Sequence, residues 1–164
     1  MKKYFITLII FTFFTESYSQ NFTNSTFAHN GVNYNVFSDG GTEEVGIYNA
    51  ANSQNIIAKV LYRTRRINYQ QLKTAIVGVF KSILTTSQVA NLQSEKIVII
   101  DILVDGTGKI NLVDFSLDYN TYLTQANIYN IEIALKNIVV QFQDGLPPEA
   151  GQLGSIGIPK RMWR

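Results

Sequence analysis

Short runs of alternating apolar and polar residues fill residues 20–67, and turn residues separate these runs. β-Branched and aromatic side chains recur at every second position from Tyr34, Val45 and Val60, which is the period of a strand with one buried face. Asn-Gly and Asp-Gly-Gly sequences lie between the runs, and both favour tight turns because they adopt positive φ easily. The pattern predicts an antiparallel β-meander of three or four strands.

The spacing of apolar residues changes to three and four after Asn68, which is the spacing of a helix with one buried face. The residues of this stripe are Tyr69, Leu72, Ile76, Val79 and Ile83. Asn68 can cap the helix, with Gln71 three residues later. We expect one amphipathic helix here, followed by an irregular connector that ends at Glu95.

A strand and a tight turn are expected in the sequence IVIIDILVDGTGKINLVDF, residues 97–115. The strand is apolar on both faces except at Asp101, so it should lie inside the sheet. A phosphate-binding loop is excluded, because Leu103 stands at its first glycine position and Ile110 replaces its hydroxyl residue. A calcium loop is excluded as well, since Leu103 and Leu112 occupy ligand positions. The turn therefore predicts a β-hairpin.

The second strand of this hairpin changes its apolar parity near Leu112, which predicts a β-bulge there. Further along, apolar residues again recur at steps of three and four and predict a second amphipathic helix. These residues are Ile128, Ile131, Leu135, Ile138 and Phe142. Asp144-Gly145 and two prolines end this run, and a short last strand is expected around Ser155–Ile158.

The beginning of the chain has a different composition. Two lysines precede an apolar run from Tyr4 to Phe14, and small residues follow at Ser17 and Ser19. This is the pattern of a secretory signal peptide, residues 1–19, with cleavage expected between Ser19 and Gln20. The apolar run is shorter than the roughly 20 residues that span a bilayer, so no retained membrane span is expected. We expect an exported protein, either periplasmic or secreted.

Residues 20–164 have the length and composition of a single domain. The whole chain contains 46% hydrophobic and 16% charged residues, and its formal net charge is +2. Such a small charge gives no concentrated basic face, so nucleic-acid binding is not expected. With no cysteine and one histidine, the chain is poorly supplied for a disulfide or a transition-metal site, and no cofactor is predicted.

The order of elements in residues 96–159 resembles the C-terminal domain of TonB-type energy transducers. The resemblance rests on the DGTGKI hairpin, the helix sequence IEIALKNIVVQF with its Ala134-Leu135 pair, the LPP sequence and the short last strand. It implies an exported α+β domain whose final strand accepts an extended peptide by strand addition. Full transducers also carry a membrane helix and a long proline-rich linker, whereas this chain has three prolines, all after residue 146.

Catalytic chemistry has few candidate residues. His29 adjoins the Asn-Gly turn, where a solvated side chain is expected rather than an acid-base catalyst. Four aspartates lie along the hairpin, and a pair of carboxylates could in principle serve glycoside hydrolysis. They are Asp101, Asp105, Asp114 and Asp118. Turn and outer-face positions account for these acids more simply, so no enzyme activity is predicted.

Two basic clusters are further candidates for binding. Arg63, Arg65 and Arg66 end the meander, where they would form either an anionic-ligand patch or a solvated strand end. In the C-terminal sequence KRMWR, Trp163 could anchor a partner or fold back on the core.

Together these patterns predict an α+β fold with an antiparallel sheet and two amphipathic helices on one face. The meander occupies 20–67, the helix and connector 68–95, and the unit that resembles the TonB domain 96–164. The predicted function is non-enzymatic binding of a protein or peptide of the bacterial cell envelope, with a small apolar-ligand carrier as the alternative. Binding by strand addition is expected at the last strand, which would also suit a homodimer. The expected edge residues are Gly154, Ser155, Ile156, Gly157 and Ile158.

Overall fold

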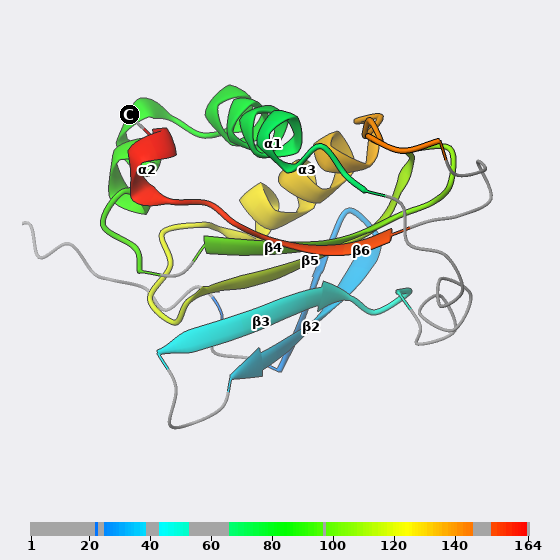
Figure 1. Cartoon of the computed structure of the whole chain (residues 1–164). Coiled ribbons are helices and arrows are strands. Elements are labelled where there is room, and N and C mark those ends of the chain that lie inside the picture. Colours follow the sequence, from blue (N-terminus) through cyan, green and yellow to red (C-terminus); the bar gives the residue numbers. More distant parts are fainter. Residues whose placement is uncertain are drawn as a thin grey trace, which may run out of the picture.

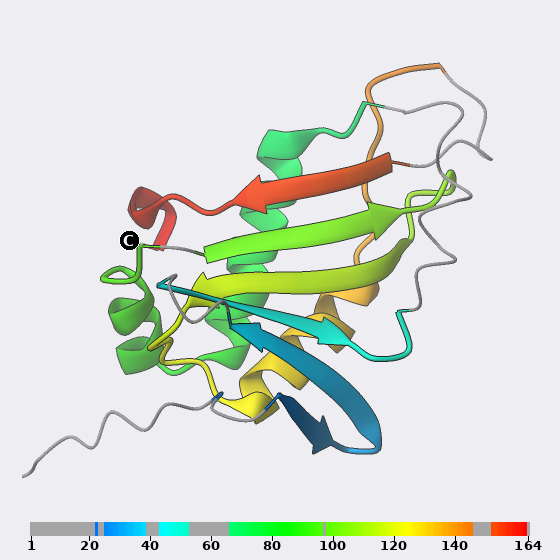
Figure 2. The same ribbon diagram turned by 90° about the horizontal axis from the view of Figure 1, so that it is seen from below.

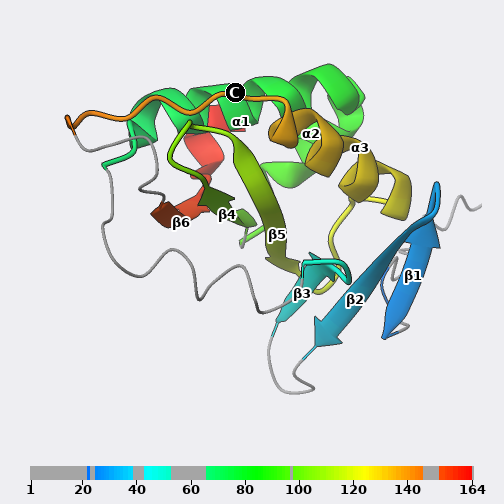
Figure 3. The same ribbon diagram turned by 90° about the vertical axis from the view of Figure 1, so that its right-hand side faces the viewer.

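The computed structural model in Figure 1 describes residue 22 and residues 25–38, 43–52, 66–96, 98–145 and 152–163. An antiparallel sheet forms one layer, and helices pack on one of its faces (Figures 1 and 3). The predicted α+β class is confirmed. The expected cleavage site at Ser19-Gln20, the predicted strand around Val60, and Arg63 and Arg65 lie outside the described residues.

The sheet has six strands in the order β1-β2-β3-β5-β4-β6. Their bounds are β1 Thr26–His29, β2 Val32–Ser38, β3 Glu44–Asn49, β4 Val98–Val104, β5 Ile110–Asp118 and β6 Gln152–Gly157. Each neighbouring pair is antiparallel. Because β3 pairs with β5, the meander and the hairpin belong to one continuous sheet.

The first helix is α1, Tyr69–Ile83, and the Asn68 side chain caps it by accepting a hydrogen bond from the Gln71 backbone N–H at 3.2 Å. Its buried face is rotated from the predicted stripe. Tyr69 is 40% exposed, whereas Phe80 is fully buried. The other buried residues of the helix are Leu72, Ile76 and Val77.

A second helix, α2 (Thr86–Leu92), occupies the stretch expected to be irregular. Thr85 and Gln88 form a reciprocal capping box at its N-terminus. Only Val89 and Leu92 are buried in this helix, and two apolar residues are too few to show a period. The described residues therefore form three α-helices, where two were expected.

The DGTGK sequence forms the turn between β4 and β5, as predicted. The Asp105 carboxylate accepts hydrogen bonds from the backbone N–H groups of Thr107 and Lys109, at 2.9 and 3.1 Å. Partial burial alone would raise the pKa of Asp105, but these hydrogen bonds and those from the Thr107 and Asn111 side chains keep it below its ordinary value. The predicted bulge is present, because Leu103 pairs with Leu112 and Val104 with Ile110, leaving Asn111 as the extra residue.

The helix after β5 is shorter than predicted. α3 spans Gln125–Lys136, and the chain then runs past the hairpin turn instead of continuing as a helix. Val140 donates its backbone N–H to the Gly108 carbonyl at 2.8 Å, and Val139 bridges to Lys109. The β-branched run that starts at Ile138 favours this extended pairing over a helix.

The core lies between the sheet and the helices α1 and α3 (Figure 3). A final 3₁₀ helix, η2 (Lys160–Trp163), brings Trp163 back into this core, where it is 2% exposed. The ring centroids of Trp163 and Phe80 are 5.3 Å apart. Of the two alternatives for Trp163, the structure shows the fold-back. Every helix in the described part of the chain is too short or too polar to cross a membrane.

Candidate binding edge and neighbouring polar sites

The strand β6 forms one edge of the sheet (Figure 2). It pairs with β4 along one side, and no strand among the described residues pairs with its other side. In an antiparallel pair, residues alternate between those that bond to the partner strand and those that point their N–H and C=O away from it. Every second residue of β6 therefore points its backbone N–H and C=O groups toward the free side.

One hydrogen bond identifies which residues these are. Ile158 donates its backbone N–H to the Val98 carbonyl at 2.9 Å, so this opposed pair is hydrogen-bonded. By alternation, Ile156 also bonds to β4, whereas Ser155 and Gly157 point their backbone groups outward. Leu153 has the same parity and completes the outward-facing set.

The expected edge residues Gly154 to Ile158 therefore divide into two groups. Ser155 and Gly157 present their backbone groups at the free side, but Gly154, Ile156 and Ile158 have the opposite parity and face β4. Ile156 and Ile158 are also buried, at 1% and 6% exposed. The predicted last strand is present, and three of the five expected edge residues have backbone groups that pair with β4. Binding at this edge stays a prediction. The alternation of residues along a strand was the signal that could have separated the outward-facing residues from those that face β4. The same alternation would have added Leu153 to the outward-facing group.

The sequence of β6 lacks two features that usually block an edge strand. Its sequence, QLGSIG, contains no charge and no proline, whereas natural edge strands commonly carry one or the other. Nothing within 4 Å would obstruct a Cβ atom added at Gly157. The opposite edge, β1, has four residues, and the hydrogen bond from the Val36 N–H to the Ser25 carbonyl leaves only Thr26 and Ala28 pointing outward.

Buried side chains anchor the end of β6 and the segment that follows it. Ile156, Ile158 and Trp163 all lie in the hydrophobic core. Gln93 donates a hydrogen bond to the Trp163 carbonyl at 3.2 Å, which ties η2 to the end of α2. The edge strand is therefore attached to the core through Ile156, and the chain that follows it is attached through Ile158 and Trp163.

Two aspartates lie on the sheet face opposite the helices, Asp101 on β4 beside β6 and Asp114 on β5. Asp101 on β4 is opposite Ser155 on one side and Asp114 of β5 on the other. Both carboxyl groups are half-buried. Burial, together with the charge of Asp101, raises the pKa of Asp114 to about 6, although a hydrogen bond from Asn52 at 3.4 Å opposes this shift. The prediction that these are outer-face acids agrees with this position.

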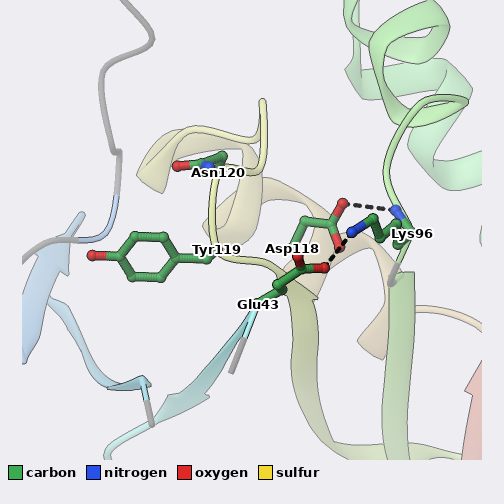
Figure 4. Close-up of a pocket in the computed structure, with 5 residues that line it drawn as sticks. All are labelled: Glu43, Lys96, Asp118, Tyr119 and Asn120. Atoms are coloured by element: carbon green, nitrogen blue, oxygen red, sulfur yellow. Dashed lines mark hydrogen bonds and ion pairs between the residues drawn. The ribbon is translucent and has the colours of Figure 1, made fainter. Parts of the chain in front are cut away.

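A shallow cleft of about 330 Å³ lies at the end of the sheet where β3 begins and β5 ends (Figure 4). Its lining residues are Glu43, Lys96, Asp118, Tyr119 and Asn120. Lys96 forms an ion pair with Glu43, and its backbone N–H donates to the Asp118 carboxylate at 2.7 Å. The hydrogen bond and charge of Glu43 raise the pKa of Lys96. Both partners of the ion pair are largely exposed, so water competes with any ligand here.

A buried polar network, which the sequence analysis missed, joins α3 to the meander. Glu132 is fully buried and accepts hydrogen bonds from the Tyr34 hydroxyl and, at 3.0 Å, from Asn49. Lys136 pairs with the same carboxylate at 2.6 Å. Burial and the hydrogen bond to Glu132 raise the pKa of Tyr34. Every oxygen of the carboxylate has a donor, so the network fixes α3 over the sheet.

A second buried carboxylate belongs to Glu95, which is 4% exposed. It accepts hydrogen bonds from the Thr121 hydroxyl and from the Tyr122 backbone N–H, both at 2.9 Å. Burial raises the pKa of Glu95 to about 7, with a smaller contribution from Asp118, against the opposing effect of these hydrogen bonds. Glu95 thereby holds the loop between β5 and α3.

The remaining predicted candidates in the described part of the chain are His29 and Arg66. His29 is half-buried rather than fully solvated, and it lies against Tyr129 of α3 with ring centroids 5.1 Å apart. Arg66 is exposed, and its backbone N–H donates to the Asp144 carboxylate. No group of three or more acidic or histidine side chains in the described residues is arranged to hold a metal ion.

A scan against models of known protein families gives no match for this chain, and a search of curated proteins gives none. Among solved structures, the chain is similar to the crystal structure of a DUF5043 family protein from Bacteroides uniformis, with a TM-score of 0.62 and 16% sequence identity. The match covers 82% of this chain and 90% of that chain. At this identity, the similarity establishes a shared α+β fold.

Proposed function

We propose that this protein is a non-enzymatic binding domain of the bacterial cell envelope that adds an extended segment of a partner protein to its sheet at β6. The observation that carries the proposal is the free side of β6, where Leu153, Ser155 and Gly157 point their backbone groups away from β4. A strand placed there gains main-chain hydrogen bonds without any change in the sheet. β6 itself carries neither the charge nor the proline that protect many natural edge strands.

The alternative, a carrier of a small apolar ligand, has less support. A carrier of that design would enclose its ligand between the sheet and the helices α1 and α3. Side chains of the core occupy that layer instead, and Ile76, Phe80, Phe115 and Ile131 are each exposed by 1% or less. Interiors packed in this way leave few voids larger than a water molecule.

Photo-crosslinking in the cell tests the proposal directly. A photoreactive residue at Gly157 has an exposed position on the edge, and one at Ala28 is the matched control on the other edge of the sheet. We expect a discrete envelope protein to be cross-linked from Gly157 and not from Ala28. Equal cross-linking from both positions, or self cross-links only, would contradict binding of a partner protein at β6.

A proline scan separates the binding side of β6 from its structural side. Ser155→Pro removes an outward N–H, which an edge strand tolerates, so partner capture should be lost while the fold is kept. Ile156→Pro instead removes an N–H that bonds to β4, and it should lower the free energy of unfolding. Ala28→Pro, which removes an outward N–H of β1, is the control that should leave capture unchanged. Normal capture by a folded Ser155→Pro variant would refute the proposal.

A further inference from the structure

We infer that the strand accepted by β6 carries a lysine or arginine opposite Ser155, and that Asp101 binds its cationic group. The inference rests on the proposed function and specifies the partner's chemistry. Two independent features of the structure lead to it. One is the outward-facing backbone of Ser155 and Gly157, which selects an extended segment, and the other is the charge on the sheet face beside them.

The register places Asp101 within reach of such a side chain. Ser155 lies directly between Asp101 and the position that an added strand would occupy. Neighbouring strands are about 4.8 Å apart, so the added residue would lie roughly 10 Å from the backbone of Asp101. A lysine or arginine stem can lie along the sheet and keep its charged end in a polar environment. Gly157, the next outward-facing residue of β6, has no side chain to obstruct this path.

Asp101 and Asp114 share the face of the sheet that lies opposite the helices. Ile100 and Ile102 are fully buried in the core under the helices, so Asp101, which lies between them on β4, faces the opposite side. Asp114 is its opposed neighbour on β5 and shares that side, and Ser155 occupies the opposed position on β6. The added residue opposite Ser155 therefore points its side chain toward the same face.

The charge of this face favours a cation. Asp101 and Asp114 lie directly opposite each other on the neighbouring strands β4 and β5. Two negative charges in such an arrangement destabilise the sheet. The two ion pairs formed between described residues use other carboxylates, Lys96 with Glu43 and Lys136 with Glu132. A cationic side chain from the added strand would offset this repulsion, a neutral one would not, and an acidic one would increase it.

A tethered strand provides the test on the full mature chain. The chain is extended at its C-terminus by about 15 Gly/Ser residues, which behave as a flexible coil, and then by the strand TVTKTVT. A second extension has glutamate in place of the lysine. Tethering raises the effective concentration of the strand to the millimolar range. The measurement is the amide hydrogen-exchange rate of Ser155 and Gly157, compared with that of the chain without an extension.

We expect the lysine strand to slow exchange at both amides by about 1.5-fold to fivefold more than the glutamate strand, which is the range expected of one exposed ion pair. Asp101→Asn should abolish this difference. Glu44→Gln, which removes a carboxylate on β3 away from β6, should preserve it. The difference should also shrink as salt concentration rises.

The outcomes distinguish the two levels of the proposal. If neither strand slows exchange at Ser155 and Gly157, strand addition itself fails, and the proposed function fails with it. If both strands slow exchange equally, or Asp101→Asn leaves the difference intact, the edge accepts a strand but the charge inference is wrong. Stronger protection by the glutamate strand would overturn the inference outright.

Discussion

The buried carboxyl group of Glu95 makes a prediction about stability that can be worked out from the structure. Its pKa is raised from 4.5 to about 7, chiefly by burial. Between these two values the folded protein keeps a proton that the unfolded chain has released, so stability must fall as pH rises. One pKa unit corresponds to about 1.4 kcal/mol, so Glu95 should remove about 3 kcal/mol from the free energy of unfolding between pH 4 and pH 8.

Glu95→Gln should remove this part of the pH dependence. Glutamine stays neutral and can still accept the hydrogen bond from the Tyr122 N–H, as protonated glutamate does. The assay is urea unfolding of both proteins at pH 4 and pH 8, and the quantity compared is the difference between their two changes in free energy. Asp114, whose pKa is about 6, titrates in both proteins and cancels from this comparison. Equal changes in wild type and variant would refute the reasoning.

Two other substitutions test the packing around the edge strand and the hairpin. Trp163→Ala should lower the free energy of unfolding by about 3 to 5 kcal/mol, because a large ring that is 2% exposed leaves the core; a loss below 1 kcal/mol in thermal or urea unfolding would contradict its place there. Gly108→Ala should also destabilise the protein, since Gly108 has a φ of +91° and an added Cβ would lie 2.4 Å from the Val140 carbonyl oxygen; an unchanged melting temperature would show that the turn does not make this close contact.

The elements that could be predicted from the sequence are those whose own residues determine them. The Asn68 cap, the alternating apolar face of β4 and the bulge beside Leu112 are local patterns, and each appears in the structure. The length of α3 could not be predicted in this way. Ile138 continues its helical spacing, but the segment that follows pairs with the hairpin turn, which is distant in the sequence. Pairing with this distant segment therefore determined the conformation after Lys136, in place of the helical spacing of the sequence.

The buried polar networks were missed for a related reason. Glu132 lies on the buried side of α3 beside Ile128 and Leu135, and its partners on β2 and β3 come 98 and 83 residues earlier. A charged residue on an apolar helix face signals a buried partner, but nothing in the sequence identifies which one. Glu95 gives no such signal, because it lies in a connector where a solvated acid is the ordinary expectation.

The alternation of β6 separates the residues that hold the strand from those that can bind. Ile156 and Ile158 face inward and contribute to the core, and Trp163 anchors the chain that follows. Ser155 and Gly157 lie between and beside them and bond to no other strand among the described residues. Substitutions at Ser155 and Gly157 should therefore change binding with little effect on stability, and substitutions at the inward positions should do the reverse. If binding and stability instead fell together at every position, β6 would serve only as part of the scaffold.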